Sequence, residues 1–361
     1  MFFLREMQPP ESHMVFCQQG RNREIKPGFK INLIKMQRFI CYIYIITMLP
    51  VSIAFGQGTT AERVTIKNGK ELIDGVLVVP AKARQAVPAM IFLGGSGQWE
   101  IVDSYLKDPS TSYANFLSFY LEGYIRRNQV AFLYLNKRGF GRSTGKYGKT
   151  SLEGRASDAN AAFEFLQNHP GIDREKIGMI GHSQGGWVAM LAASKNERVA
   201  FVISFAGPTV GVKHQTLTDY KNQFDCQYGK GSKSNRKFRR KKMELWAGSV
   251  IGKLIGGSAG EYARMVKYDP KQALLNIRMP CLLLFGEKDL IVPPDENVQY
   301  FKKIFHGDVP GVFTCFVGRK LNHAFHEVDN GCVGYMESLK KPESRELQLF
   351  LQGWIEMHVM R

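Results

Sequence analysis

The sequence lacks the cysteine patterns that mark zinc modules and disulfide-rich scaffolds. Its 361 residues include six cysteines, at positions 17, 41, 226, 281, 315 and 332, and no two of them form a Cys-x-x-Cys pair. Both kinds of structure need closely and regularly spaced cysteines. The apolar fraction of 44% and the charged fraction of 22% also exclude a disordered polyelectrolyte. We therefore expect a globular protein whose stability comes mainly from a hydrophobic core.

Long hydrophobic runs are almost absent, and the one exception lies near the N-terminus. Residues 39–55 read FICYIYIITMLPVSIAF, with Lys35 and Arg38 before them and Gly56 after them. A basic stretch, an apolar stretch and a small-x-small site are typical of a secretory signal peptide. At this length the run is also near the lower limit for a membrane span. We expect an exported protein, periplasmic or secreted, with an N-terminal membrane anchor as the alternative.

This assignment divides the chain. A signal peptide should begin near the initiator, so we expect residues 36–56 to be the signal and residues 1–35 to come from an overextended start. Residues 57–361 would form the folded domain. Its four cysteines could form a disulfide in an oxidising compartment, with Cys315 and Cys332 the nearest pair in sequence, or could remain as free thiols.

Acidic residues are in short supply. Lys and Arg number 49 against 32 Asp and Glu, a net charge of +17. The excess is concentrated: residues 1–56 carry seven basic and three acidic residues, and eight of the thirteen residues from Lys230 to Lys242 are basic. No nucleic-acid motif or patterned aromatics accompany this run, so we expect no nucleic-acid partner. The run is interpreted as a solvated segment that could contact anionic surfaces.

Strands and helices alternate from about residue 62. Apolar runs predict strands at 63–67, 72–79, 89–93, 130–135, 177–180, 199–205, 281–285 and 312–317, and helical periodicity predicts helices at 115–127, 156–168, 184–194, 296–305 and 344–358. This alternation indicates an α/β fold built from βαβ units around a mostly parallel sheet. Residues 208–272 interrupt it without a buried strand and are interpreted as an inserted cap.

A nucleophile motif follows one of the predicted strands. Residues 181–185 read GHSQG, which fits G-x-S-x-G between a strand and a helix. Such a turn presents the Ser183 hydroxyl at the carboxyl edge of the sheet, and the Gln184 N–H at the start of the helix can face a developing oxyanion. Without catalysis, the same pattern would be a glycine-rich turn in an ordinary α/β protein.

A catalytic serine needs a base and an acid that orients it, in the chain order Ser, Asp or Glu, His. Asp289 follows the predicted strand 281–285 and is the acid candidate, with Glu287 as its local competitor. His323 follows the strand 312–317 and is the base candidate, with His326 as the alternative.

A second oxyanion donor is expected from the loop after the strand 89–93. That loop reads GGSGQ at residues 94–98, and its glycines allow the backbone to approach a substrate oxygen. Ser96 is our choice for the donating N–H, with Gly97 possible. The loop lacks the spacing and the lysine of a phosphate-binding P-loop.

Taken together, IFLGGSG, LNKRGFGRSTG, IGMIGHSQGGWVAMLAA, LLLFGEKDLIVPP and NHAF resemble the α/β-hydrolase superfamily, in particular its secreted esterase-like and prolyl-oligopeptidase-like branch. The resemblance spans roughly residues 60–360. It implies an eight-stranded, mostly parallel sheet and a triad of Ser183, Asp289 and His323, with oxyanion donors at Ser96 and Gln184. In the family, the residue before Lys137 in this turn is usually Asp, whereas this sequence has Asn136.

The resulting expectation is a serine hydrolase that cleaves a small-molecule carboxylic ester without metal or cofactor. A peptidase or amidase acting on short peptides with the same triad is the first alternative. It is less favoured because peptide-cleaving relatives often carry an N-terminal propeller domain, for which residues 57–88 leave no room. A catalytically inactive hydrolase fold that binds an anionic surface is the second alternative. The oligomeric state cannot be derived from these patterns.

Overall fold

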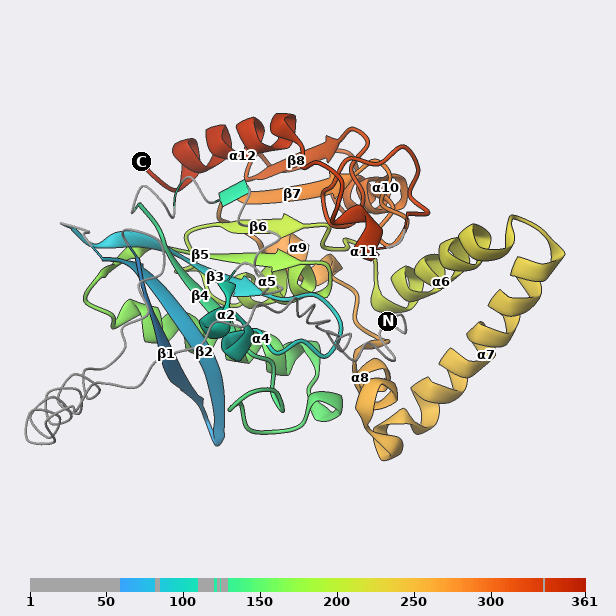
Figure 1. Ribbon diagram of the computed structural model, residues 1–361, viewed down its shortest axis with the longest axis horizontal. Coiled ribbons are helices and arrows are strands. Elements are labelled where there is room, and N and C mark those ends of the chain that lie inside the picture. Colours follow the sequence, from blue (N-terminus) through green and yellow to red (C-terminus); the bar gives the residue numbers. More distant parts are fainter. Residues whose placement is uncertain (1–58, 82–84, 110–119, 122–123, 125–128, 334) are drawn as a thin grey trace, which may run out of the picture. The chain divides into compact units, whose positions relative to one another are not determined.

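The computed structural model describes residues 59–361 except 82–84, 110–119, 122–123, 125–128 and 334 (Figure 1). The chain divides into two units, Met1–Ala54 and Phe55–Arg361, and all described residues belong to the second. The predicted segments 1–35 and 36–56 therefore lie outside the described residues. The predicted helix 115–127 also falls mostly outside them, although Tyr120, Leu121 and Tyr124 are described as helical and buried.

An eight-stranded sheet forms the centre of the second unit (Figure 1). The strand order is β1-β2-β4-β3-β5-β6-β7-β8. The pairs β1–β2 and β2–β4 are antiparallel, and every pair from β4 to β8 is parallel. The strands are β1 (Thr59–Asn68), β2 (Glu71–Pro80), β3 (Val87–Leu93), β4 (Ala131–Leu135), β5 (Ile172–His182), β6 (Val202–Phe205), β7 (Cys281–Gly286) and β8 (Phe313–Gly318). The predicted mostly parallel α/β architecture is confirmed.

The central strands are buried because helices cover both faces of the sheet. All residues of β3, β4 and β7 are buried, which explains why they appear in the sequence as unbroken apolar runs. The helices are α2 (Val102–Lys107), α4 (Leu152–Gln167), α5 (Gln184–Ala193), α9 (Lys271–Asn276), α10 (Pro294–Ile304), α11 (Tyr335–Ser338) and α12 (Arg345–His358), with a 3₁₀ turn η3 at Tyr147–Lys149.

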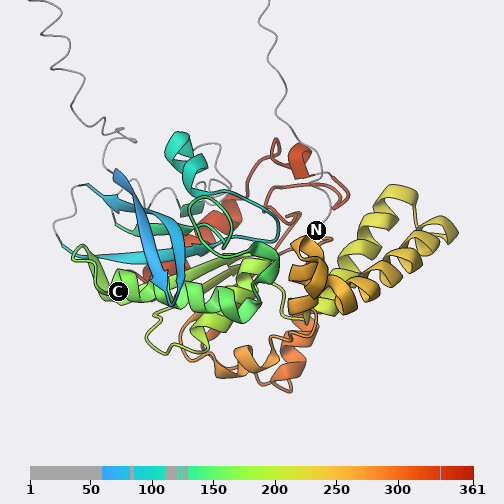
Figure 2. The same ribbon diagram turned by 90° about the horizontal axis from the view of Figure 1, so that it is seen from below.

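Two layers of helices pack on the sheet. Residues of α2 and α12 share one core cluster with alternate residues of the strands, such as Met90, Phe92, Phe132 and Ile180. Helices α4 and α5 contact β5 and β3. They cover the opposite face of the sheet, to which the other alternate residues of these strands point. In Figure 2 the strands accordingly lie between the teal α2 and the green α4.

A helical insertion separates β6 from β7. It consists of α6 (Val212–Tyr228), α7 (Ser232–Ile255) and α8 (Gly257–Met265), which fall within the predicted cap 208–272. Both views show α6 and α7 extending away from the sheet (Figures 1 and 2). Helix α7 contains the basic run from Arg236 to Lys242. No helix among the described residues is long and apolar enough to span a membrane.

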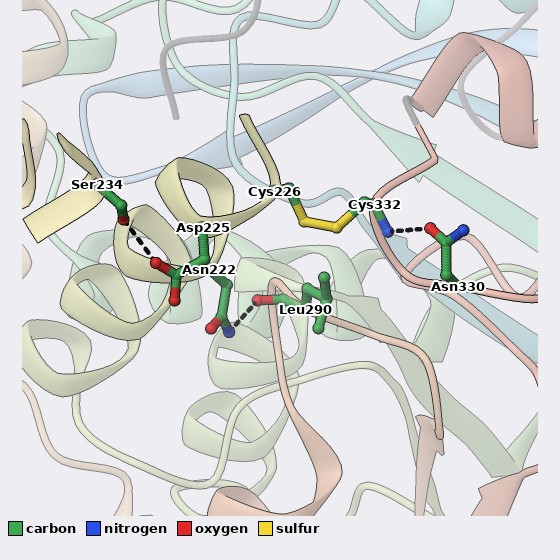
Figure 3. The surroundings of a disulfide bond; sticks show 7 residues. All are labelled: Asn222, Asp225, Cys226, Ser234, Leu290, Asn330 and Cys332. Carbon is green, nitrogen blue, oxygen red and sulfur yellow. Dashed lines mark hydrogen bonds between the residues drawn. A yellow bond between two sulfur atoms is a disulfide. The ribbon is translucent and has the colours of Figure 1, made fainter. Parts of the chain in front are cut away.

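One disulfide joins the insertion to the rest of the domain. Cys226 in α6 is bonded to Cys332, and the two Cα atoms are 5.4 Å apart (Figure 3). The pairing of Cys315 with Cys332, which their nearness in sequence suggested, is therefore wrong. Cys315 lies on β8 and is a free thiol, as is Cys281. Nearness in sequence failed here because the insertion folds back on the loop after β8, and sequence spacing does not reveal that contact.

Asn136 illustrates how an unusual residue fits this fold. It follows β4 and is buried. Its amide nitrogen donates to Asp74 at 3.0 Å and to Glu100 at 2.5 Å, while its oxygen accepts from the Ile101 N–H at 2.7 Å. An aspartate could not donate to two carboxylates. Asparagine at this position therefore matches the acidic neighbours that this particular chain carries.

Candidate active site

Ser183 occupies a strained turn between β5 and α5. Its backbone has φ 53° and ψ −122°, a region that residues other than glycine rarely adopt. The Ser183 N–H donates to the Phe205 carbonyl at 2.9 Å, which fixes the turn to the neighbouring strand β6. Such strain persists only where the surroundings enforce it, and it occurs more often at functional sites than elsewhere. The strand–turn–helix context predicted from GHSQG is present.

The glycines on either side of Ser183 are required by close backbone contacts. A Cβ atom on Gly181 would collide with the backbone of Gly185, and a Cβ atom on Gly185 would collide with the carbonyl of Leu93. The second contact presses the start of α5 against the end of β3, where the loop 94–98 begins. The two segments expected to donate to an oxyanion, at Gln184 and Ser96, are therefore neighbours.

Asp289 and His323 form a close pair. A carboxylate oxygen of Asp289 lies 2.7 Å from His323 Nδ1, and Asp289 is only 1% exposed. The other carboxylate oxygen accepts from the N–H groups of Ile291 at 2.8 Å and Val292 at 2.9 Å. The aspartate is thus held by backbone donors so that it can orient the imidazole. This is the arrangement that the sequence predicted for these two residues.

His323 also lies beside the turn that carries Ser183. Its carbonyl accepts a hydrogen bond from Nε2 of His182 at 3.0 Å, and the two imidazole centroids are 4.9 Å apart. Burial, together with repulsion from His323, lowers the pKa of His182 to about 3. A neutral His182 with its proton on Nε2 satisfies this contact. Ser183 directly follows His182 in the sequence. The contact between His182 and His323 therefore brings Ser183 and His323 to the same edge of the sheet.

The two competing candidates have other partners. Glu287 accepts from the Lys320 N–H at 2.8 Å and is exposed, and it does not take the place of Asp289 beside the imidazole. His326 is buried, and its Nδ1 lies 2.8 Å from the Lys341 carbonyl. Both have structural contacts away from the Asp289–His323 pair.

Lys137 organises the loop that carries Ser96, and sequence reasoning did not identify it as a site residue. Its ammonium donates to the carbonyls of Gly95 and, at 3.0 Å, of Gly97. The Gly95 carbonyl and the Ser96 N–H belong to one planar trans peptide and point in opposite directions. Lys137 therefore sets the direction of the expected donor. Burial, with the charge of Arg155, lowers the pKa of Lys137 to about 7.

A buried ion pair ties Gln184 to the insertion. Arg155 on α4 donates to the side chain of Gln184 and, at 2.5 Å, to Glu261 on α8. Glu261 is fully buried and also accepts from the Tyr147 hydroxyl at 2.5 Å. This network was not predicted, because residues far apart in sequence build it and no local motif marks them. The network connects Gln184, the expected backbone donor after Ser183, to helix α8 of the insertion.

Helix α6 contacts the loop that carries Asp289. Asn222 donates to the Leu290 carbonyl at 2.8 Å (Figure 3). Gln215, on the same helix, donates to the carbonyl of Ile291. Asp219, between these two residues, is buried, and burial raises the pKa of its carboxyl, as does the nearby charge of Asp289. The insertion thus supports Asp289 from outside the sheet.

The described part of the chain contains no cluster of three or more His, Cys, Asp or Glu side chains placed to hold a metal ion. What it does bring together at the carboxyl edge of the sheet is a strained serine, a carboxylate–imidazole pair, the start of α5 and the loop 94–98.

Comparison with known proteins agrees with this architecture. Residues 160–245 match the family model described as BAAT / Acyl-CoA thioester hydrolase C terminal. The protein bem46 of Schizosaccharomyces pombe (strain 972) is 29% identical over 179 residues, which are 48% of this chain and 48% of that protein. The chain thus covers about half the length of this curated relative.

Solved structures share the fold at low sequence identity. Est1E from Butyrivibrio proteoclasticus, solved with ferulic acid bound, has a TM-score of 0.51 and 15% identity over 82% of this chain and 100% of that one. The acylaminoacyl peptidase of Pyrococcus horikoshii has a TM-score of 0.54 and 18% identity over 84% of this chain and 42% of that one. Sheet order, helical layers and these matches together show that this chain has the α/β-hydrolase fold.

Proposed function

We propose that this protein is an exported serine hydrolase that cleaves carboxylic esters through an acyl-enzyme formed on Ser183. The observation that carries the proposal is the Asp289–His323 pair, with 2.7 Å between carboxylate oxygen and Nδ1, beside a serine held at φ 53°. A strained serine alone could be a structural turn. A buried carboxylate that orients an imidazole at the same sheet edge supplies the base that the serine requires.

In the proposed reaction, His323 removes the proton of Ser183 as the hydroxyl oxygen attacks the ester carbonyl. Asp289 keeps the imidazole in the tautomer that leaves Nε2 free to accept this proton and stabilises the resulting cation. His323 then protonates the leaving alcohol. In the second half, His323 activates water, which attacks the acyl-enzyme and releases the acid.

The tetrahedral intermediates carry a negative charge on the former carbonyl oxygen. The N–H groups of Gln184 and Ser96 are the proposed donors to that oxygen, because the contact between Gly185 and Leu93 brings their segments together. Loss of one such donor typically costs about 2.7–4 kcal/mol of transition-state stabilisation.

A panel of substrates tests both the chemistry and the ester preference. It comprises p-nitrophenyl esters of increasing acyl length, an acyl thioester and a matched anilide. The thioester is included because the matching family model describes a thioester hydrolase. We expect ester turnover to exceed anilide turnover. A higher kcat/KM for the anilide than for every ester would replace the proposed ester preference by the amidase alternative.

Matched carboxylate variants separate the proposed acid from its neighbour. Asp289→Asn is expected to lower kcat about 10⁴-fold, because an amide favours the wrong tautomer of the base. Glu287→Gln, two residues away and exposed, should change kcat less than twofold. Equal effects of the two substitutions would refute the assignment of Asp289.

Export is part of the same proposal. The Cys226–Cys332 disulfide supports it, because such bonds persist mainly in oxidising compartments. N-terminal sequencing of the protein recovered from its native host should give a chain that begins near Gln57. A protein recovered from the cytosol with its first 56 residues intact and reduced cysteines would contradict it.

A further inference from the structure

Helix α7 exposes a row of large apolar side chains. Met243, Trp246, Val250 and Leu254 are 69%, 70%, 61% and 89% exposed. They follow one another at intervals of three or four residues, so they lie on one face of the helix. Contiguous exposed apolar surface of this kind marks an interaction site.

The same face continues into the basic half of the helix. Arg236 and Arg239 precede Met243 at the same three- and four-residue intervals, and both are exposed. The helix is 24 residues long, which corresponds to about 36 Å at 1.5 Å per residue. One continuous stripe, Arg236-Arg239-Met243-Trp246-Val250-Leu254, is therefore cationic at its first end and apolar at its other end.

Among the residues that the structure describes, none buries the stripe; α7 packs on the domain through its other sides. Lys237 lies 5.8 Å from the Tyr228 ring centroid, and Lys241 lies 5.0 Å from that of Tyr220; both tyrosines are on α6. Gly252 is buried against α8, so closely that an added Cβ atom would collide with the Ala259 carbonyl. These contacts hold the opposite and lateral sides of α7. The packing of the described residues thus gives no reason for the exposed stripe.

The arrangement of cationic and apolar side chains along the stripe favours one kind of binding partner over the others. Two copies of α7 packed in parallel would oppose their arginines, and in antiparallel packing each arginine would face an apolar side chain. The N-terminal segment 1–56 has more basic than acidic residues, so it does not complement Arg236 and Arg239. A nucleic acid would leave Trp246 and Leu254 uncovered. An anionic bilayer offers phosphates and an acyl boundary side by side.

We propose that α7 lies flat on the surface of an anionic lipid bilayer, with Arg236 and Arg239 at lipid phosphates and with Trp246 and Leu254 in the acyl boundary. This surface does not depend on the proposed chemistry at Ser183. It would place the hydrolase at a membrane surface without a membrane span in the insertion.

Trp246 provides a readout specific to this surface. The sequence has four tryptophans, none of them in residues 1–56. Trp187 and Trp354 are each 5% exposed, whereas Trp246 is 70% exposed. The full chain is mixed with vesicles of phosphatidylcholine alone or with 30% phosphatidylglycerol, and each spectrum is corrected with the Trp246→Phe variant. A binding signal from the apolar run 39–55 contributes no tryptophan emission and is thereby separated.

We expect a blue shift of Trp246 and its quenching by brominated acyl chains with the anionic vesicles only, weakened at 0.5 M salt. The absence of a shift with both vesicle types would overturn the proposal. Binding of the protein to vesicles without a change at Trp246 would assign the contact to another segment. A concentration-dependent shift without lipid would indicate a second copy or another protein surface, and a shift with duplex DNA alone would indicate nucleic acid; each of these results also overturns it.

Paired substitutions test the two halves of the stripe. Arg236→Glu with Arg239→Glu, and separately Leu254→Asp, should each weaken binding to anionic vesicles at least tenfold. The matched control is Lys67→Glu with Lys70→Glu, which changes the net charge equally at exposed positions of the β1–β2 hairpin. Equal weakening by the control would attribute the attraction to total charge and overturn the role of α7. Unchanged far-UV circular dichroism shows that each variant is folded.

Discussion

At the residue scale, Ser183 combines local strain with the proposed reactivity. A non-glycine residue at φ 53° typically costs about 1–3 kcal/mol, which the surrounding contacts must offset. The hydrogen bond from Ser183 N–H to Phe205 and the close packing of Gly181 and Gly185 provide this restraint. The strained backbone of Ser183 thus lowers the stability of the fold at the position of the proposed nucleophile.

This account predicts an unusual stability difference between two inactive variants. Ser183→Gly should be more stable than Ser183→Ala by about 1 kcal/mol, because glycine relieves the strain even after its larger entropy loss on folding is counted. Urea unfolding of both variants measures the difference. If the alanine variant were the more stable one, the backbone at this position would not be strained.

Lys137 has a role that could not be predicted from the sequence. It stands inside LNKRGFGRSTG, but nothing in the motif indicates that its ammonium holds the carbonyls of Gly95 and Gly97. A charged residue two positions after a buried strand, at the carboxyl edge of a parallel sheet, was the available signal. The three residues of the proposed triad could be selected from the sequence because each follows a recognisable strand. Their supporting contacts could not, because these join distant parts of the chain.

Kinetics of Lys137 variants test its positioning role. Lys137→Met should lower kcat about 10–100-fold on the preferred ester while KM changes less than threefold, because the Ser96 N–H acts mainly in the transition state. Lys137→Arg, which keeps the donors, should recover part of kcat. A variant that raises KM with kcat unchanged would show that Lys137 supports substrate binding and not the oxyanion donor.

At the element scale, the insertion is attached at several points to the edge of the sheet that carries Asp289 and His323. Cys226 is bonded to Cys332 in the loop after His323, and Asn222 reaches the carbonyl next to Asp289 (Figure 3). On its other side, Glu261 of α8 pairs with Arg155. From the sequence, 208–272 could be recognised as an insertion without strands, but its three-helix form and these attachments depend on contacts between distant residues.

Removal of the disulfide tests this attachment. The bond spans 106 residues, and bonds that close long loops typically contribute about 2–4 kcal/mol. Cys226→Ser with Cys332→Ser should lower the free energy of unfolding by about this amount, and reductant should have no further effect on the variant. Cys315→Ser is the control and should match the wild type. A double variant as stable as the wild type would show that the insertion is held without the bond.

At the scale of the whole molecule, the mostly parallel sheet could be anticipated from sequence because apolar runs and the elbow motif mark its strands. The sequence pattern did not reveal that α7 extends away from the sheet, because its apolar residues at helical spacing resemble those of a core helix. Met243, Trp246 and Leu254 are exposed instead. Periodicity reports that a helix has an apolar face, but it does not report what covers that face.

The buried ammonium of Lys137 should also affect the stability of the whole domain. Its pKa falls from 10.5 to about 7 on folding, so between these pH values the unfolded chain binds more protons than the folded one. Stability relative to Lys137→Met should therefore rise with pH above 7, by at most about 1.4 kcal/mol per pH unit. Urea unfolding of both proteins at pH 7, 8 and 9 measures this. A difference that is constant or falls with pH would contradict the lowered pKa.

The central claim is that Ser183 is the nucleophile, and covalent labelling tests it most directly. The protein is treated with a fluorophosphonate, digested, and mapped by mass spectrometry. The account predicts one phosphonyl adduct, on Ser183, with loss of ester hydrolysis in proportion to labelling, and neither labelling nor turnover in Ser183→Ala. An adduct on another residue, or full ester hydrolysis by Ser183→Ala, would contradict it.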